Sequence, residues 1–308
     1  MNKSICIISP IYNEEENLVN HLRNLERTRT KLIKQKYNVN LVLVNDGSND
    51  NSLSKLKRLS KKKKFIKIIN LTKNYGQQIA IYVALREVNS DYYGVVDSDG
   101  QQDPSLFLKM TSKIKKNNVE IVQMRKRYGF HESYLKSFFS KMFYIFFVYL
   151  THIDLKSGSS DFYLVTKKVR NAIISSDISK YFLRGYIHSL GLSKLYIEYT
   201  PSIRKQGNSK YSINRQLDFA LTAIYLYGTK LFTKIFILSF FIILISFGFI
   251  IYSIYEHYVR DVQVPGWASI IILVTFFGAL NIFFMSLVTF FSIKFGNVLS
   301  MKDKYIKK

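Results

Sequence analysis

Two long apolar stretches in the carboxyl-terminal third constrain this chain more than any other feature of its sequence. Residues 232–255 contain a single charge, Lys234, and residues 267–293 contain none. A helix of about 20 apolar residues crosses a bilayer core about 30 Å thick. Each stretch therefore predicts a membrane-spanning helix, with a buried core helix as the alternative, and the residues before them are left to form a separate domain.

Positive charge surrounds this apolar pair. The chain carries a formal net charge of +24, although 48% of its residues are hydrophobic. Such a charge fits either nucleic acid or an anionic membrane. The apolar stretches favour the membrane, so we expect no nucleic-acid partner. Lysines gather on the outer flanks of the pair, while the loop between the stretches holds one arginine, which places both termini in the cytosol by the positive-inside rule.

The amino terminus lacks the features of a secretory signal. Residues 4–9 form a short strand-like run that Pro10 and a polar loop follow, without a long apolar core or a small-residue cleavage site. We therefore expect the amino-terminal domain to stay in the cytosol.

Short apolar runs alternate with helical segments and polar loops in the first half of the chain. Strands are expected at 5–8, 41–44, 66–71, 92–96 and 121–124, and helices ending near residue 32, over 54–64, after residue 76 and over 106–116. Strand, helix and strand in this order make a βαβ unit, whose parallel strands gather ligands at their carboxyl ends. The sequence thus predicts an α/β, Rossmann-like, mainly parallel sheet.

Acidic side chains follow two of these strands. Asp97 and Asp99, in VVDSDGQQDP, are separated by one residue, so both can reach one Mg²⁺ or Mn²⁺ ion that would hold a diphosphate. Asp46, in NDGSNDNS, can accept a hydrogen bond from the imide N–H of a uracil. Turn-forming roles are the alternative for all three residues.

Two further segments have apolar side chains at helical spacing but are too short to cross a bilayer. Residues 133–150 repeat phenylalanines and leucine with lysines between them, and residues 214–227 form a second amphipathic pattern. Both are interpreted as interfacial amphipathic helices, and for the first a buried domain helix is the alternative.

Four loops carry a resemblance to a known family: PIYNEEEN, NDGSNDNS, NYGQQIA and DSDGQQDP, in this order. They resemble the GT-A glycosyltransferases of family two, and more narrowly the branch of dolichol-phosphate mannose synthases and bactoprenol glucosyltransferases. That branch moves a sugar from a nucleotide diphosphate to a polyprenyl phosphate. The resemblance implies a cytosolic GT-A domain over residues 1–212, an amphipathic juxtamembrane helix over 213–230 and two membrane helices within 231–308, in a bacterial inner (cytoplasmic) membrane.

The resemblance also implies roles for single residues. Nucleotide-sugar binding falls on Pro10, Tyr12, Asn13, Glu14, Asp46, Asp97, Ser98, Asp99 and Gln101. The metal site falls on Asp97 and Asp99, with Mg²⁺ or Mn²⁺ as the cofactor. Acceptor-phosphate binding falls on Arg204, Ser209 and Lys210, within R-x-x-G-x-S-K-Y, and more weakly on Arg184.

Asp161 and Asp99 are the expected catalytic residues. Asp161, in SSDFYLV, matches the aspartate that precedes Phe-Arg-Leu in a loop-then-strand segment of the family, so we expect it in a loop before a strand. A phosphate monoester is mostly dianionic at neutral pH and needs little deprotonation. We therefore expect Asp161 to orient the acceptor or to stabilise positive charge on the sugar, and its action as a base stays open.

Two positions depart from the family pattern. Asn45 stands where an aspartate often precedes Asp46, and Tyr163 stands where the family has arginine. The first departure leaves the choice between UDP and GDP open, and the second removes a cation next to Asp161.

The expected activity is that of an inverting hexosyltransferase. UDP-glucose or a related UDP-sugar would be the donor, and undecaprenyl phosphate on the cytosolic leaflet the acceptor; a homo-oligomer is compatible with the sequence. One alternative is a processive polysaccharide synthase, which would be expected to carry Q-x-x-R-W, whereas the single tryptophan, Trp267, lies in an apolar stretch. The other is a non-catalytic membrane scaffold with a decayed GT-A domain.

Overall fold

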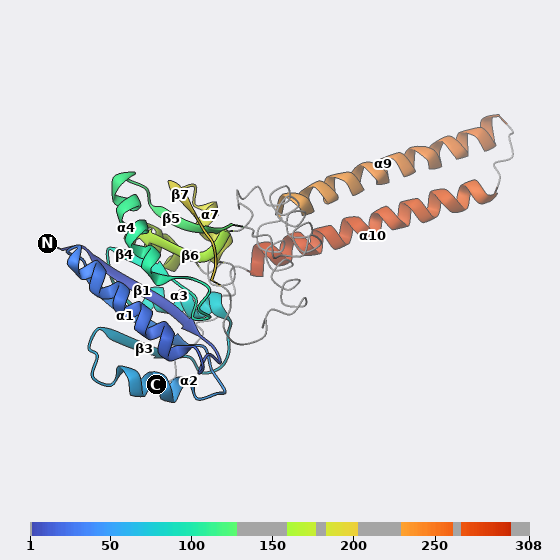
Figure 1. The fold of residues 1–308 in the computed structure, drawn as a ribbon. Coiled ribbons are helices and arrows are strands. Elements are labelled where there is room, and N and C mark those ends of the chain that lie inside the picture. The colour runs from blue at the N-terminus through green and yellow to red at the C-terminus, as the bar shows by residue number, and fades with distance from the viewer. Residues whose placement is uncertain (1, 128–158, 177–182, 203–228, 261–265, 297–308) are drawn as a thin grey trace. The chain divides into compact units, whose positions relative to one another are not determined.

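A seven-stranded sheet organises the amino-terminal unit of the structure, a computed structural model that describes residues 2–127, 159–176, 183–202, 229–260 and 266–296 (Figure 1). The strands are β1 (Ser4–Ile11), β2 (Asn38–Asn45), β3 (Ile66–Asn70), β4 (Tyr92–Val95), β5 (Ile121–Lys126), β6 (Ser159–Thr166) and β7 (Lys194–Tyr199). Their order is β3-β2-β1-β4-β6-β5-β7. All paired neighbours are parallel except β6, which runs antiparallel to both β4 and β5. The mainly parallel α/β sheet is thus confirmed.

Helices cover both faces of this sheet. They are α1 (Leu18–Lys34), α2 (Ser52–Ser60), α3 (Gln77–Glu87), α4 (Phe107–Lys116), which follows the short 3₁₀ turn η1 (Pro104–Leu106), α6 (Lys167–Ile174) and α7 (Leu183–Ser189). Side chains alternate along each strand, so Cys6 and Ile8 of β1 join the core under α3, α6 and α7. Ile5 and Ile7 join the core under α1, α2 and α4. The result is a three-layer domain with helices on both faces of one sheet.

β1 is longer than the sequence predicts, because it continues through Pro10 and Ile11. Ile8 accepts a hydrogen bond from the amide of Val96 at 3.1 Å. Backbone groups alternate in direction along a parallel strand, so Pro10 faces the same side as Ile8, at a level where β4 has already ended. The amide that proline lacks is therefore not needed for pairing.

The structure differs from the sequence prediction at two other elements, α2 and β7. The helix expected over 54–64 is shorter, because α2 ends at Ser60 and Lys63 pairs with Glu26 of α1. No strand was expected at β7, although Leu195 and Ile197 alternate with Tyr196 there, which is the period of a strand.

A helical pair forms a second compact unit. It consists of α9 (Thr229–Val259) and α10 (Gly266–Gly296), which run side by side (Figure 1). The rings of Phe236 and Phe283 stack between them with centroids 4.5 Å apart. Large apolar side chains such as Leu238 (61% exposed) and Met285 (72% exposed) point outward, as expected for helices that face lipid rather than a protein core.

Both helices contain the apolar stretches predicted from the sequence. The windows Thr233–Val259 and Ile272–Thr289 are long and apolar enough to cross a membrane. The amphipathic helices expected over 133–150 and 214–227, and the domain boundary expected at 212–213, lie outside the described residues.

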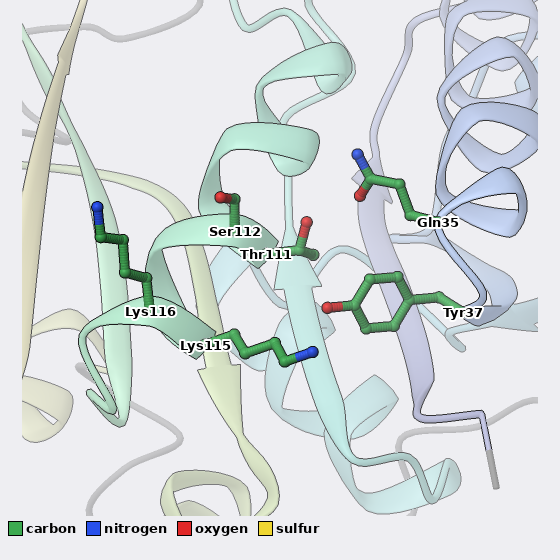
Figure 2. Close-up of a pocket in the computed structure, with 6 residues that line it drawn as sticks. All are labelled: Gln35, Tyr37, Thr111, Ser112, Lys115 and Lys116. Carbon is green, nitrogen blue, oxygen red and sulfur yellow. The ribbon is translucent and has the colours of Figure 1, made fainter.

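A shallow polar cavity of about 500 Å³ lies away from the carboxyl ends of the strands (Figure 2). Its lining residues are Gln35, Tyr37, Thr111, Ser112, Lys115 and Lys116. Gln35 and Tyr37 directly precede β2, and Lys115 and Lys116 end α4, so the cavity belongs to the amino-terminal ends of the strands. It shares no residue with the carboxylates that the sequence singles out.

His21 gives the domain a predictable response to acid. It lies on the buried face of α1, where its Nε2 atom is 2.8 Å from the hydroxyl of Ser9, and burial lowers its pKa to about 4. The unfolded chain, with an ordinary histidine pKa near 6.5, binds the proton more readily, so stability is lost as the pH falls from about 6.5 towards 4. Between pH 7 and pH 5 the wild type should lose about 2 kcal/mol more unfolding free energy than His21→Gln.

Thermal unfolding of both proteins in detergent at the two pH values measures this difference. Parallel losses of stability in wild type and variant would contradict the assignment of a neutral, buried His21.

Candidate active site

Asp97 and Asp161 reach the same edge of the sheet from strands of opposite direction. Val95, the last residue of β4, pairs with Tyr163 of the antiparallel strand β6. Asp97 follows Val95 by two residues and Asp161 precedes Tyr163 by two, so this register places both carboxylates beyond the carboxyl end of β4. The strand that breaks the parallel pattern thereby completes the site.

Asp161 was expected in a loop that precedes a strand, and this expectation is wrong. Asp161 lies within β6 and is only 5% exposed. β6 begins earlier than the apolar pattern indicates, because Ser159 already pairs with Arg125 of β5.

The Asp97 carboxylate is held by two glutamines. Gln77 Nε2 donates to Asp97 Oδ1 and Gln102 Nε2 donates to Asp97 Oδ2, each at 2.5 Å. Gln102 Oε1 in turn accepts from the Asp97 amide at 2.9 Å, which fixes the orientation of the Gln102 side chain. Asp97 is thus fixed at both oxygens by neutral donors.

The electrostatics around Asp97 favour a cation. Burial, and next the negative charges of Asp161 and Asp99, raise the pKa of Asp97 to about 8, against the opposing effects of Arg184 and the hydrogen bond from Gln102. A carboxyl group in this state gains strongly from a divalent ion, because the ion favours the charged form that burial penalises.

Asp161 forms an ion pair with Arg184 of α7. The guanidinium binds both carboxylate oxygens, Nε to Oδ1 at 3.0 Å and Nη2 to Oδ2 at 2.7 Å. Gln78 Nε2 donates to Asp161 Oδ2 at 3.0 Å as well. Arg184 was expected to bind acceptor phosphate, and in the structure its guanidinium is engaged by Asp161.

The DSDG loop is tied to its neighbours on both sides. Ser98 Oγ donates to the carbonyl of Pro10 at 3.0 Å, and the amide of Gln101 donates to Asp99 Oδ1 at 3.0 Å. The carbonyl of Gln101 accepts from the amide of Ser202 at 3.0 Å. Asp99 therefore lies in a loop anchored to β1 and to the segment that follows β7.

Asp46 holds the loop that leads into α3. Its two carboxylate oxygens accept hydrogen bonds from the amides of Tyr75 (2.8 Å) and Gly76 (2.9 Å). Burial raises the pKa of Asp46 to about 6, and these backbone hydrogen bonds act against the rise. Contact of Asp46 with a base stays a prediction from the resemblance.

The residues expected to line the nucleotide pocket after β1 connect two loops. Asn13, with a left-handed φ of 51°, donates through its amide to Ser48 Oγ at 3.1 Å. Its side-chain oxygen accepts from the amide of Asn49 at 2.8 Å. Glu14 is 8% exposed and its amide donates to Ser52 Oγ at 3.0 Å. Tyr12 is half-buried beside them.

Both departures from the family pattern leave a buried oxygen without a hydrogen bond among the described residues: Asn45 Oδ1 and Tyr163 Oη. Asn45 Nδ2 donates to Asn70 Oδ1 at 2.7 Å, so the ends of β2 and β3 are joined by amides rather than by a carboxylate. Burial, and next the charge of Asp161, raise the pKa of Tyr163. Where the family has an arginine, this chain has Tyr163, and the cation that contacts Asp161 is Arg184.

No cluster of three or more His, Cys, Asp or Glu side chains suited to a metal occurs within the described ranges. The available oxygen ligands are those of Asp97 and Asp99. Such a pair fits an ion that completes its coordination with water and with the phosphates of a substrate, as Mg²⁺ commonly does.

Sequence reasoning did not assign Gln77, Gln78 and Gln102 to the carboxylates. Their positions within NYGQQIA and DSDGQQDP place them in motifs of the site. An amide side chain can bind many different groups, so the sequence does not indicate which carboxylate each one contacts. Arg204, Ser209 and Lys210 lie outside the described residues, and their roles stay predictions.

Comparisons with known proteins identify the family of the chain. Residues 6–176, more than half of the chain, match the family model described as glycosyl transferase family 2. An uncharacterized glycosyltransferase of Synechocystis sp. is 29% identical over 92% of this chain and 87% of that protein. The bactoprenol glucosyl transferase of Shigella phage SfV is 22% identical over 90% of this chain and 89% of that protein. The undecaprenyl-phosphate 4-deoxy-4-formamido-L-arabinose transferase of Proteus mirabilis is 26% identical over 68% of this chain and 63% of that protein.

The backbone at Gly47, in the Asp46 loop, packs closely against the loop before α3. Gly47 has a φ of +63°, and a Cβ atom there would lie 2.3 Å from the carbonyl carbon of Lys73. Gly191 has the same φ of +63° with no heavy atom within 4 Å of such a Cβ. Gly191→Ala should cost about 1 kcal/mol through its left-handed backbone alone, and Gly47→Ala should cost clearly more.

Thermal unfolding midpoints of the two variants in detergent make this comparison. Equal shifts for Gly47→Ala and Gly191→Ala would contradict the close backbone contact.

Proposed function

Because the chain belongs to glycosyl transferase family 2, we propose that it is an inverting membrane hexosyltransferase. Its donor is a nucleotide diphosphate sugar, UDP-glucose or a related UDP-sugar. Its acceptor is a polyprenyl phosphate, undecaprenyl phosphate, on the cytosolic leaflet of a bacterial inner membrane. The convergence of Asp97 and Asp161 at one edge of the sheet is the observation that carries this proposal.

The donor side of the reaction is assigned to Asp97 and Asp99. These residues would hold Mg²⁺ or Mn²⁺, which supplies neutralisation of the diphosphate as it leaves the sugar. Gln102 and Gln77 keep the Asp97 carboxylate in place, and the anchored DSDG loop keeps Asp99 beside it. The family resemblance adds Tyr12, Asn13, Glu14 and Asp46 as residues that bind the nucleotide.

Asp161 supports an inverting reaction by the way it is bound. A retaining enzyme with a covalent intermediate would need a carboxylate free to attack the sugar. Asp161 instead has both oxygens bound by Arg184, and one of them also by Gln78. A single displacement by the acceptor phosphate inverts the anomeric carbon, and Asp161 with Arg184 would orient that phosphate or stabilise charge on the sugar.

The acceptor side is assigned to Arg204, Ser209 and Lys210. Ser202, whose amide binds the carbonyl of Gln101 at 3.0 Å, precedes Arg204 by two residues in the sequence. The last described residue before this basic motif is therefore in direct contact with the DSDG loop. Arginine offers a planar pair of donors to phosphate and lysine offers a compact charge.

A lipid acceptor gives the apolar helices a role. α9 and α10 are long and apolar enough to cross a membrane, and they would keep the domain at the surface where a polyprenyl phosphate is found. The name of the Proteus mirabilis relative contains undecaprenyl phosphate, and that of the Shigella phage SfV relative contains bactoprenol.

Asp99→Ala should abolish metal-dependent transfer. The loss should be at least about 100-fold, since a bound metal contributes several kcal/mol to stabilising the leaving group. Transfer from a panel of labelled UDP- and GDP-sugars to undecaprenyl phosphate in membranes is the measurement. Asp103→Ala, which removes an exposed carboxylate that caps η1, is the matched control and should retain activity. Undiminished transfer by Asp99→Ala would contradict the assignment of Asp99 to the metal site.

Arg204→Ala should raise the KM for undecaprenyl phosphate by tenfold or more, about 1.4 kcal/mol for one charge-assisted phosphate contact. The KM for the nucleotide sugar should stay close to the wild-type value. Steady-state kinetics with each substrate varied in turn separate the two. An equal rise in both KM values would refute a role at the acceptor.

A further inference from the structure

Two adjacent glutamines at the start of α3 serve two different carboxylates. Gln77 Nε2 donates to Asp97 Oδ1 at 2.5 Å, and Gln78 Nε2 donates to Asp161 Oδ2 at 3.0 Å. Asp97 follows β4 and Asp161 lies in β6, so one dipeptide joins the two strands from which the site is built.

Gln78 contacts both members of the ion pair. Its Nε2 atom donates to Asp161, and its Oε1 atom accepts from the backbone amide of Arg184 at 3.4 Å. The side chain therefore fits in one orientation only, because a rotated amide would turn its oxygen towards a carboxylate. α3, β6 and α7 are linked at this one side chain.

The start of α3 is itself held in place from the other side. Asp46 binds the amides of Tyr75 and Gly76, the two residues before Gln77. A chain of direct contacts thus runs from the end of β2 through the start of α3 to both carboxylates.

We propose that Gln77 and Gln78 are positioning residues that set the separation between the donor-side carboxylate and the acceptor-side ion pair. This inference rests on the proposed function, in which Asp97 serves the metal and diphosphate and Asp161 serves the acceptor. Gln77 acts on the donor through Asp97. Gln78 acts on the acceptor through Asp161 and Arg184. Because the two residues are adjacent at the first turn of one helix, neither carboxylate can shift without straining the other contact.

Methionine replaces glutamine at similar volume without a hydrogen-bond donor, so Gln77→Met and Gln78→Met separate the two contacts. Gln35→Met, at an exposed position in the polar cavity of Figure 2, is the matched control. All three are made in the full chain, purified in detergent. UDP binding with Mn²⁺ is measured by titration calorimetry, and transfer to undecaprenyl phosphate by steady-state kinetics.

Gln77→Met should weaken Mn²⁺-dependent UDP binding by about tenfold, as is typical when a residue that orients a metal ligand is lost. Gln78→Met should bind UDP within about twofold of the wild type while kcat/KM for the lipid falls by about tenfold or more. Thermal unfolding midpoints close to that of Gln35→Met establish that both variants are folded.

Unchanged UDP binding by Gln77→Met would overturn the proposal, and so would equal losses of UDP binding in both variants. A wild-type protein that transfers no sugar to lipid phosphate would refute the proposed acceptor instead. In that case the calorimetric comparison still decides whether Gln77 positions the donor site.

Discussion

The burial of carboxylates at one edge of the sheet is the constraint on which this site depends. Burial, and next the charges of Asp161 and Asp99, raise the pKa of Asp97, so the ionised form of Asp97 needs compensating partners. The guanidinium of Arg184 binds Asp161, and the amide groups of Gln77, Gln78 and Gln102 bind Asp97 and Asp161. Because the amides are neutral, Arg184 supplies the positive charge among these contacts, and a divalent cation would favour the ionised form of Asp97 that burial penalises.

The fold explains how this concentration of charge is assembled. Parallel strands bring the loops after β1, β2, β3, β4, β5 and β7 to one edge. The antiparallel strand β6 brings its beginning to that same edge, and with it Asp161. The helices on the two faces pack against apolar side chains that alternate along the strands. Cys6 and Ile7 of β1, for example, belong to the cores on opposite faces of the sheet. The polar contacts of the site therefore specify geometry more than they contribute to stability.

Much of this architecture could be predicted from the sequence, because it depends on local patterns. The apolar runs before Asp46 and Asp97 predict β2 and β4, and the absence of charge over 267–293 predicts α10. The placement of Asp161 inside β6 could not be predicted, because it depends on pairing between Ser159 and Arg125 across 34 residues of sequence. Nor could the pairing of Arg184 with Asp161, since an arginine fits a phosphate as well as a carboxylate.

A diffraction experiment on crystals of the full chain grown with Mn²⁺ and UDP, at a wavelength where manganese scatters anomalously, tests the central claim most directly. We expect one manganese peak within about 2 to 2.5 Å of a carboxylate oxygen of Asp99 or Asp97 and in contact with the diphosphate. A UDP molecule bound with its diphosphate away from these carboxylates, or manganese at another place in the domain, would contradict it.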